Sequence, residues 1–275
     1  LKRIIINPTI ISIYYYNFAE MVQCMNRFGI YFLISFVVVS SFQCARRSLP
    51  TGGFKDTLPP NIVNTSPKMN TVFFDKEKIT ITFDEYIKLV DLNKQLIISP
   101  PLEPNKYKVK PQGTVSKKIQ IELLDSLLEN TTYTFNFGES IIDNNEGNLL
   151  PFFNYAISTG AIIDSLEIKG KITDSYERIT DSYTSVYLYP IDSTYTDSTI
   201  FLKKPFYATS TLDSTVYNFR NLRPDKYQIV AIKDISGNYI FDQSVDKIGF
   251  IEEPVTLPGD SVINFRIFKE VPNLY

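Results

Sequence analysis

The sequence predicts an all-β protein that consists of two consecutive antiparallel β-sandwich domains after an N-terminal apolar segment. Its 18 Tyr and 20 Phe accompany many Thr, Ile and Val residues, a balance that favours strands over helices. Short runs of alternating polar and apolar residues recur between turn signals, as in a sandwich. Beyond the apolar segment no long run has the 3.6-residue apolar period of a helix, and 275 residues leave room for about two domains.

The composition excludes several classes of function. The chain contains no histidine, which removes Ser-His-Asp and Cys-His nucleophile systems and metal sites built from imidazole. Its 28 Lys and Arg face 30 Asp and Glu, for a net charge of −2, so there is no broad basic field to bind nucleic acid. We therefore expect a protein that is not an enzyme and that does not bind nucleic acid.

The N-terminal region has the features of an export signal. Asn26-Arg27 precedes the apolar stretch 29–39, which is within the range of signal peptides and short for a membrane span. Cys44 follows this stretch, and only Cys24 accompanies it in the chain. The arrangement resembles the lipobox of bacterial lipoproteins, although Gln43 stands where that motif has a small residue. The resemblance implies that Cys44 carries the lipid and becomes the N-terminus after cleavage.

Three alternatives remain for this region: an ordinary cleaved signal, a retained anchor, and a disulfide between Cys24 and Cys44. We expect residues 1–43 to form the signal region, of which 1–20 or 1–24 reflect a start placed too far upstream. Residues 44–58 are polar and rich in Pro and Gly, which predicts a flexible tether. The expected location is the cell envelope, as an outer-membrane lipoprotein facing the periplasm, with the membrane contacted through the lipid.

The strand-like runs fall into two blocks, expected to form domains over 59–160 and 161–275. The second block is expected to form its sandwich over about 165–269, and Asp125–Leu128 is the one place where a short helical turn is expected. In the first block the runs are 78–83, 95–99, 118–123, 132–137 and 155–158, and in the second they are 166–172, 185–189, 216–219, 227–232 and 261–267.

Several motifs of the first block resemble a bacterial Ig-like domain of the SbsA type. Pro59-Pro60 and Asn64-Thr65-Ser66-Pro67 precede the strand-like Ile79–Tyr86, and Thr131–Leu150 contains an Asp-x-x-Gly-Asn-x-Leu-like loop. The order is similar to lipoproteins of the Bacteroidota that carry such a domain after the lipid anchor. The second block resembles carboxypeptidase-regulatory-like or prealbumin-like modules through Tyr217–Tyr227, with Asp225 in place of the family's Gly.

Two carboxylate groups of the first block are candidate sites with simpler explanations. Adjacent strand residues point to opposite faces, so Asp84 and Glu85 are not expected to line one acid–base site. Asp143–Asn148 offers oxygen ligands for calcium, but its Asn and Gly residues are also those of an ordinary turn.

The stronger metal candidate is a loop in the second block. Asp234, Ser236, Asn238 and Asp242 occupy positions 1, 3, 5 and 9 of this loop, as oxygen ligands do in looped calcium sites. The glycine stands at position 4 rather than 6, and Val245 occupies position 12, where a bidentate glutamate is needed. An ordinary connecting turn is therefore the alternative, and no other cofactor is expected.

These observations predict a membrane-anchored envelope lipoprotein that acts as a non-enzymatic module recognising protein or glycan. One alternative is an accessory or truncated component of an envelope enzyme or transport assembly. Another is a calcium-dependent adhesin, which the loop at Asp234 would support. The many tyrosines of the second block fit either a contact surface or sheet packing, and packing is the simpler explanation.

Overall fold

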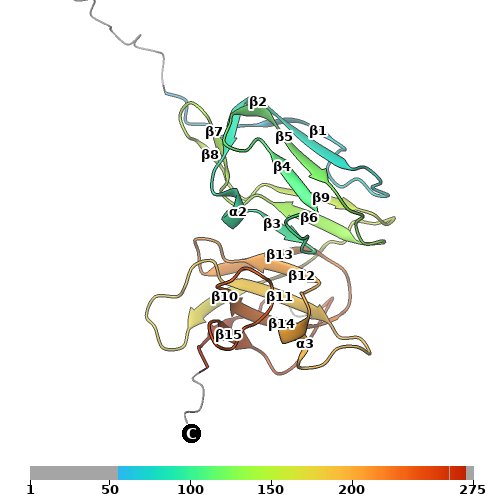
Figure 1. Ribbon diagram of the computed structural model, residues 1–275, viewed down its shortest axis with the longest axis vertical. Helices are drawn as coiled ribbons and strands as arrows, with labels where there is room; N and C mark the ends of the chain where they lie inside the picture. Colours follow the sequence, from blue (N-terminus) through green and yellow to red (C-terminus); the bar gives the residue numbers. More distant parts are fainter. Residues whose placement is uncertain (1–54, 260, 271–275) are drawn as a thin grey trace, which may run out of the picture. The chain divides into compact units, whose positions relative to one another are not determined.

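The computed structural model describes residues 55–259 and 261–270. They form strands β1 to β17 and two helical turns, α2 (Leu92–Gln95) and α3 (Thr199–Leu202), so the predicted all-β fold class is confirmed (Figure 1). The predicted signal region, Cys44 and most of the predicted tether lie outside the described residues. Among the described residues no helix is long and apolar enough to cross a membrane.

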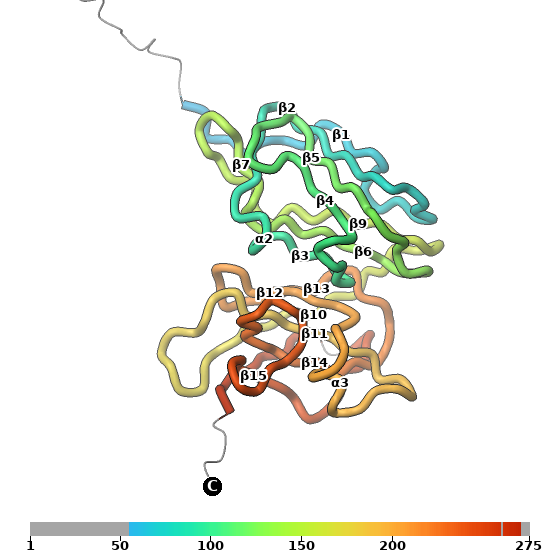
Figure 2. Tube along the Cα trace, viewed as in Figure 1, coloured from blue at the N-terminus to red at the C-terminus, as the bar shows by residue number. Residues whose placement is uncertain are grey.

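The first sandwich is built from strands β1 to β9 in two antiparallel sheets. One sheet has the order β4-β5-β2-β7-β8, with β1 also paired to β2, and the other has the order β3-β6-β9. Figure 2 follows the chain through both sheets in the blue to yellow-green part of the trace. The strands are β1 (Ile62–Ser66), β2 (Lys78–Leu89), β3 (Ile97–Ser99), β4 (Tyr107–Lys110), β5 (Ser116–Leu123), β6 (Thr132–Asn136), β7 (Ile141–Asp143), β8 (Leu149–Leu150) and β9 (Asn154–Ser158).

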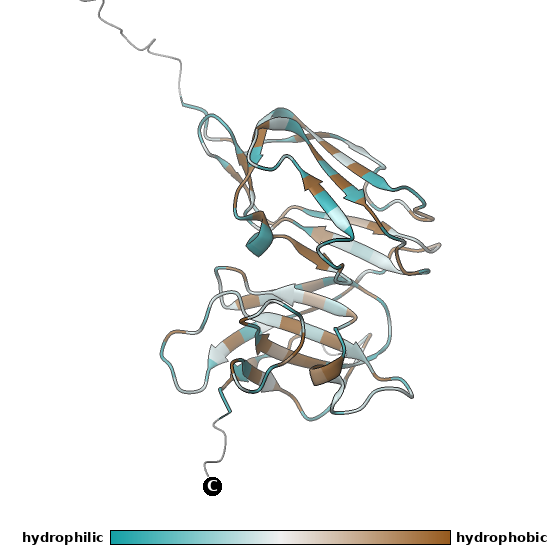
Figure 3. Cartoon of the chain, in the orientation of Figure 1, coloured by the Kyte–Doolittle hydropathy of each residue, from teal (hydrophilic) through white to brown (hydrophobic). Residues whose placement is uncertain are grey.

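Alternation along the strands produces the core of the first sandwich. In β2 the side chains of Ile79, Ile81 and Phe83 are buried, while the residues between them are more exposed. They meet Ile119 and Ile121 of β5 in one core that also includes residues of β3, β6 and β9. Apolar and polar residues alternate along these strands in Figure 3. The period of two thus directs one face of each sheet inward.

The second sandwich is built from strands β10 to β17. A sheet of order β13-β10-β17 faces a sheet of order β12-β11-β14-β15, with β16 also paired to β14. The β10–β17 pair is parallel, whereas the other strand pairs of this sandwich are antiparallel. The strands are β10 (Leu166–Asp174), β11 (Ser185–Pro190), β12 (Tyr207–Ser210), β13 (Val216–Leu222), β14 (Lys226–Lys233), β15 (Lys247–Phe250), β16 (Val255–Thr256) and β17 (Phe265–Ile267).

The structure departs from the sequence-based prediction at several short elements. The prediction of a helical turn at Asp125–Leu128 is wrong. This segment is irregular, and its Asp125 forms an ion pair of 2.6 Å with Lys106. The run 261–267 contributes only its last three residues to a strand, and the chain before them contacts β10 through the isolated bridge Lys169↔Val262. The strands that were not predicted, β1, β4, β7, β8, β12, β15 and β16, are two to five residues long.

The buried side chain of Gln95, at the end of α2, links the first sandwich to the second. Its Oε1 accepts the backbone N–H of Glu139 at 3.0 Å, and its Nε2 donates to the Tyr183 hydroxyl at 3.2 Å and to Asp213 Oδ2 at 3.3 Å. The Tyr183 hydroxyl also donates to Asp213 at 2.7 Å. Burial and this carboxylate together raise the pKa of Tyr183 to about 12, so the hydroxyl keeps its proton.

Two further contacts join the two sandwiches. The backbone N–H of Ala208, in strand β12, donates to Ser99 Oγ in β3 at 3.1 Å. Lys204 Nζ lies 2.6 Å from Glu103 Oε1. Because β12 lies at one end of its sheet, its outward N–H groups need partners outside that sheet. Ser99 supplies such a partner to Ala208.

Replacing Gln95 is expected to weaken this junction. In Gln95→Ala the N–H of Glu139 and the Asp213 carboxylate lose a buried partner, which costs about 1–3 kcal/mol of the free energy of unfolding. Urea unfolding of the variant and of Gln112→Ala, an exposed glutamine of the first sandwich, provides the comparison. Equal losses in the two variants would contradict the proposed role of Gln95.

Candidate binding surface on the second sandwich

The sheet β12-β11-β14-β15 is apolar on both of its faces. In β11, Val186 and Leu188 belong to the core between the two sheets, whereas Tyr187 and Tyr189 belong to a separate cluster on the opposite face. All four side chains are at most 2% exposed. Strands of an antiparallel sandwich commonly have one solvated face. This sheet instead needs a second layer over its outer face.

Strand β14 shows the same double burial. Ile229 and Ala231 point to the inner core, and Val230 and Ile232 point to the outer cluster. The run Ile229–Ile232 is therefore apolar at four consecutive positions, as expected for a strand buried on both faces. We call the sheet surface formed by Tyr187, Tyr189, Ala208, Val230, Ile232 and Ile248 the outer face, and Phe241 of the loop between β14 and β15 packs in the same cluster.

Helix α3 and the loop between β14 and β15 form the second layer over the outer face. Ile200 of α3 packs against the outer face, and its carbonyl accepts the backbone N–H of Phe241 at 3.0 Å. The rings of Phe201 and Phe241 are 5.3 Å apart, and those of Tyr187 and Tyr239 are 5.8 Å apart. Aromatic contacts of this kind join both segments to each other and to the sheet.

The Asp234 carboxylate organises the start of this loop. Its Oδ1 accepts the backbone N–H of Gly237 at 2.7 Å and the Ser236 hydroxyl at 3.2 Å. Its Oδ2 accepts the backbone N–H of Tyr239 at 2.8 Å and the Tyr187 hydroxyl at 2.9 Å. Burial, followed by the nearby Asp234 carboxylate, raises the pKa of Tyr187 well above its usual range. The buried hydroxyl therefore stays a donor to the loop.

Asp246, at the end of the same loop, is 1% exposed and acts in the same way. Its Oδ1 accepts the N–H of Ile235 and its Oδ2 accepts the N–H of Asp242, both at 2.9 Å. Two carboxylates, one at each end, thus satisfy backbone donors that would otherwise be unpaired in a loop packed against an apolar surface.

The four residues predicted to bind calcium each form hydrogen bonds within this loop. Ser236 lies beside Asp234, but Asn238 Oδ1 accepts the N–H of Ile240 at 2.8 Å, and Asp242 Oδ1 accepts the N–H of Ser244 at 2.9 Å. Over residues 55–259 and 261–270, no group of three or more His, Cys, Asp or Glu side chains is arranged to hold a metal ion. Calcium binding by this loop stays a prediction.

The carboxylates singled out in the first sandwich also organise the backbone. Asp143 is fully buried, and its two oxygens accept the N–H groups of Asn145, Glu146, Gly147 and Asn148 at 2.7–3.1 Å. Burial alone would raise the pKa of Asp143, but these four donors outweigh it and lower the pKa. Asp84 Oδ1 accepts the backbone N–H of Asn61, the residue before strand β1, at 2.9 Å.

The second layer leaves part of the outer face open as a cavity of about 550 Å³. Its inner wall consists of the buried side chains of Val230, Phe241 and Ile248, which are 2%, 5% and 6% exposed. Phe201 and Phe250 also line the cavity and are 43% and 54% exposed. Ligand cavities are typically apolar concavities of roughly 300–1,000 Å³. This one therefore has the size and chemistry of a binding site.

The charged residues that line the cavity are all acidic. They are Asp197, Glu252 and Glu270, and the lining includes no lysine or arginine. Glu270 Oε2 accepts a hydrogen bond of 2.6 Å from Gln243. Among the described residues none of the three carboxylates has an ion-pair partner. The cavity lining thus combines aromatic side chains with three carboxylates and no basic residue.

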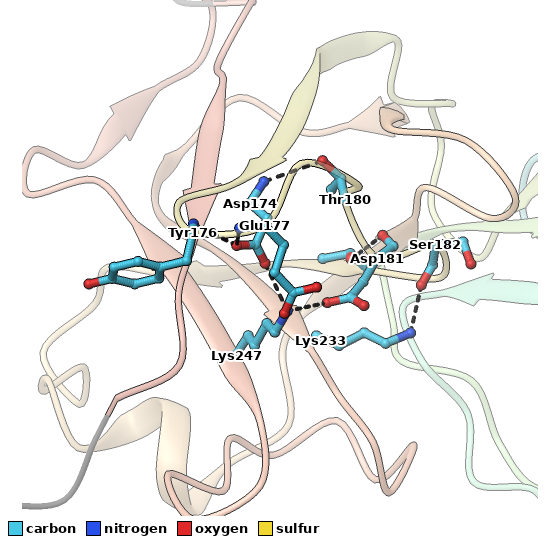
Figure 4. Close-up of polar contacts among 9 residues, drawn as sticks. Asp174, Tyr176, Glu177, Thr180, Asp181, Ser182, Lys233 and Lys247 are labelled. Atoms are coloured by element: carbon cyan, nitrogen blue, oxygen red, sulfur yellow. Dashed lines mark hydrogen bonds and ion pairs between the residues drawn. The ribbon is translucent and has the colours of Figure 1, made fainter.

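Lys247, the first residue of β15, joins this strand to the end of β10 and to the loop that follows β10 (Figure 4). Its ammonium lies 2.8 Å from Asp174, 2.9 Å from Glu177 and 2.8 Å from Asp181. The Lys247 side chain is 18% exposed and that of Asp174 is 2% exposed. Burial opposes ionisation of both groups, but the contacts between them reverse that effect, so the pKa of Lys247 is raised and that of Asp174 is lowered.

Comparison with known proteins identifies the first sandwich. Residues 56–159 match the family model of a bacterial Ig-like domain. A search of curated proteins found no match. Similar solved structures include an L,D-transpeptidase from Mycobacterium smegmatis (10% identity, covering 56% of this chain and 74% of that one, TM-score 0.25). They also include BcpA, the major pilin subunit of Bacillus cereus (10% identity, covering 77% of this chain and 71% of that one, TM-score 0.24). A third is the N-terminal part of the bacterial S-layer protein SbsC (11% identity, covering 71% of this chain and 45% of that one, TM-score 0.24). At these scores the likenesses add nothing to the argument on function.

The cavity is not evident from the sequence, although part of the signal is present there. The four consecutive apolar residues of β14 indicate a strand buried on both faces, which implies a second layer over the sheet. The residues around the opening come from α3, β15 and the chain after β17. No local pattern reveals that these distant segments meet. Tyr187, Tyr189, Tyr207 and Tyr217 are buried, so sheet packing explains them.

Asp234→Asn is expected to destabilise the second layer. An amide group cannot accept all four donors that the carboxylate binds, so we expect a loss of about 1–3 kcal/mol of unfolding free energy. Thermal unfolding of wild type, Asp234→Asn and the control Asp75→Asn, an exposed aspartate of the first sandwich, each with and without calcium chloride, measures this. A loss that is the same in both buffers fits the structural role. A calcium-dependent rise in the wild-type melting temperature that Asp234→Asn abolishes would instead support a metal site.

Lys247→Met is expected to lower the free energy of unfolding by about 3–5 kcal/mol at neutral pH, because it leaves the Asp174 carboxylate buried without its cation. The pKa of Asp174 is lower in the folded protein than its ordinary value of 3.8, which applies to the unfolded chain. The ionised carboxylate therefore stabilises the folded state above pH 3.8, and this stabilisation is lost as the pH falls through the lower pKa of the folded state. The difference between wild type and variant should therefore shrink below about pH 4. Urea unfolding at pH 7 and pH 3 tests this, with Lys110→Met, whose pair with Glu122 is at the surface, as the control. A difference that does not change with pH would contradict the explanation.

Proposed function

We propose that this protein is a non-enzymatic module of the bacterial cell envelope, anchored by a lipid on Cys44, that recognises a partner through the second sandwich. The match of residues 56–159 to a bacterial Ig-like domain carries the proposal. The motifs of that segment further suggest the SbsA type and an origin in the Bacteroidota. Anchoring in the outer membrane with the domains in the periplasm is part of the same proposal.

Recognition rather than turnover agrees with the side chains that the structure brings together. The carboxylates of Asp143 and Asp246, which are buried, and of Asp234, which is half-buried, accept backbone N–H groups that hold loops in place. General acid–base catalysis requires groups within reach of a substrate, whereas these oxygens are occupied within the protein. The cavity on the outer face, in contrast, opens to solvent and offers an aromatic surface. Its role would be to bind a protein or glycan, with the two sandwiches as its support.

Intact-mass analysis of membrane-extracted protein tests the anchor. We expect a diacyl or triacyl adduct on a chain that begins at Cys44, and we expect Cys44→Ala to lose both the adduct and the membrane association. Cys24→Ala is the matched control and should keep both. An unmodified mature chain in the soluble fraction would contradict the lipoprotein proposal and would leave a free periplasmic or secreted β protein.

A further inference from the structure

We propose that the cavity on the outer face binds a segment of a partner protein in which an apolar side chain is flanked by lysine or arginine. The proposal deepens the proposed function, since it names the class of partner that the second sandwich recognises. It does not depend on the lipid anchor, because the cavity lies wholly within residues 195–270.

The aromatic lining supplies the apolar part of the site. Phe201 and Phe250 are about half exposed at a cavity whose inner wall is formed by the buried Phe241, Val230 and Ile248. The ring of Phe201 packs against that of Phe241, with centroids 5.3 Å apart, and the ring of Phe250 packs against that of Phe268, with centroids 6.3 Å apart. An apolar side chain that enters the cavity would replace solvent against these rings. Aromatic residues at the centre of an interface commonly contribute most of its affinity.

The charges of the lining select a cationic partner. Asp197, Glu252 and Glu270 place three carboxylates around the cavity, with no basic residue in its lining. Such an arrangement attracts lysine or arginine and repels anions. A neutral oligosaccharide carries no charge for the carboxylates to attract, and an anionic glycan would be repelled. The stems of lysine and arginine can also pack on phenylalanine rings, so a basic residue suits both parts of the cavity.

The expected spacing of the partner residues follows from strand geometry. In an extended peptide, residues two apart point to the same side and lie about 6.5–7 Å apart. An apolar residue with basic residues two positions before and after it would present all three side chains to one surface. The probe is therefore the fluorescein-labelled peptide Ser-Lys-Ser-Phe-Ser-Lys-Ser with blocked ends. One control peptide replaces both lysines by glutamate, and a second replaces the phenylalanine by serine.

Binding of these peptides to the purified full chain is measured by fluorescence anisotropy. We expect the lysine peptide to bind with a dissociation constant below about 1 mM, and each control peptide to bind at least about tenfold more weakly. Affinity should fall as the salt concentration rises, because exposed charges are screened. Binding that is equal for the lysine and glutamate peptides, or no binding of the lysine peptide up to about 1 mM, would overturn the proposal.

Matched variants locate the site on the protein. Phe250→Ser should weaken binding about tenfold, whereas Phe73→Ser, which replaces a 68% exposed phenylalanine of the first sandwich, should leave it unchanged. Glu252→Lys should weaken binding about fivefold or more, whereas Glu253→Lys, an exposed neighbour outside the cavity lining, should have little effect. Melting temperatures confirm that each variant is folded. Equal effects within either pair would overturn the assignment.

An oligosaccharide provides the competing outcome. Chitohexaose is expected not to displace the labelled peptide. If it displaces the peptide, and if it binds Glu252→Lys as well as wild type, the cavity recognises glycan and the proposal is wrong. Because the readout is binding by the purified chain, a negative result here leaves the envelope location untouched. Absence of a lipid on Cys44 would likewise leave the peptide result untouched.

Discussion

Burial of the sheet β12-β11-β14-β15 on both faces is the constraint on which the rest of the second sandwich depends. Its inner face forms the core with β10, β13 and β17, and its outer face requires a further layer. That layer is made of α3 and the loop between β14 and β15, two segments with little regular structure. Because irregular segments cover an apolar face less completely than a sheet does, an opening remains, and it becomes the cavity.

Irregular segments packed on an apolar face carry backbone N–H groups that water cannot reach, so they need acceptors from the protein. Asp234 and Asp246 meet this need in the second sandwich, and Asp143 meets it in the first. Several donors converge on each carboxylate, and at Asp143 they outweigh burial and lower the pKa. The same residues that resemble metal ligands in the sequence therefore serve as caps of local turns. Aspartate within a loop is compatible with both roles, and only the partners of its oxygens distinguish them.

The sequence was sufficient for the fold class and for the longer strands. Runs such as 78–83 and 118–123 alternate clearly because each strand has one face on a single core. The short strands, such as β8 (Leu149–Leu150) and β16 (Val255–Thr256), contain too few residues to show a period. The cavity was not predictable either, because Phe201, Phe250 and Phe268 are distant in sequence and meet only after the sheets pair.

Local properties of the chain, namely the period of two and the content of β-branched and aromatic residues, are enough to predict antiparallel sandwiches. The sequence also places Cys44 after an apolar stretch and shows that histidine chemistry is absent. The tertiary structure decided which loops cover the outer face and where the carboxylates of Asp197, Glu252 and Glu270 gather. The physical reason is that alternation specifies which side of a strand is buried, but contacts between distant segments specify what it is buried against.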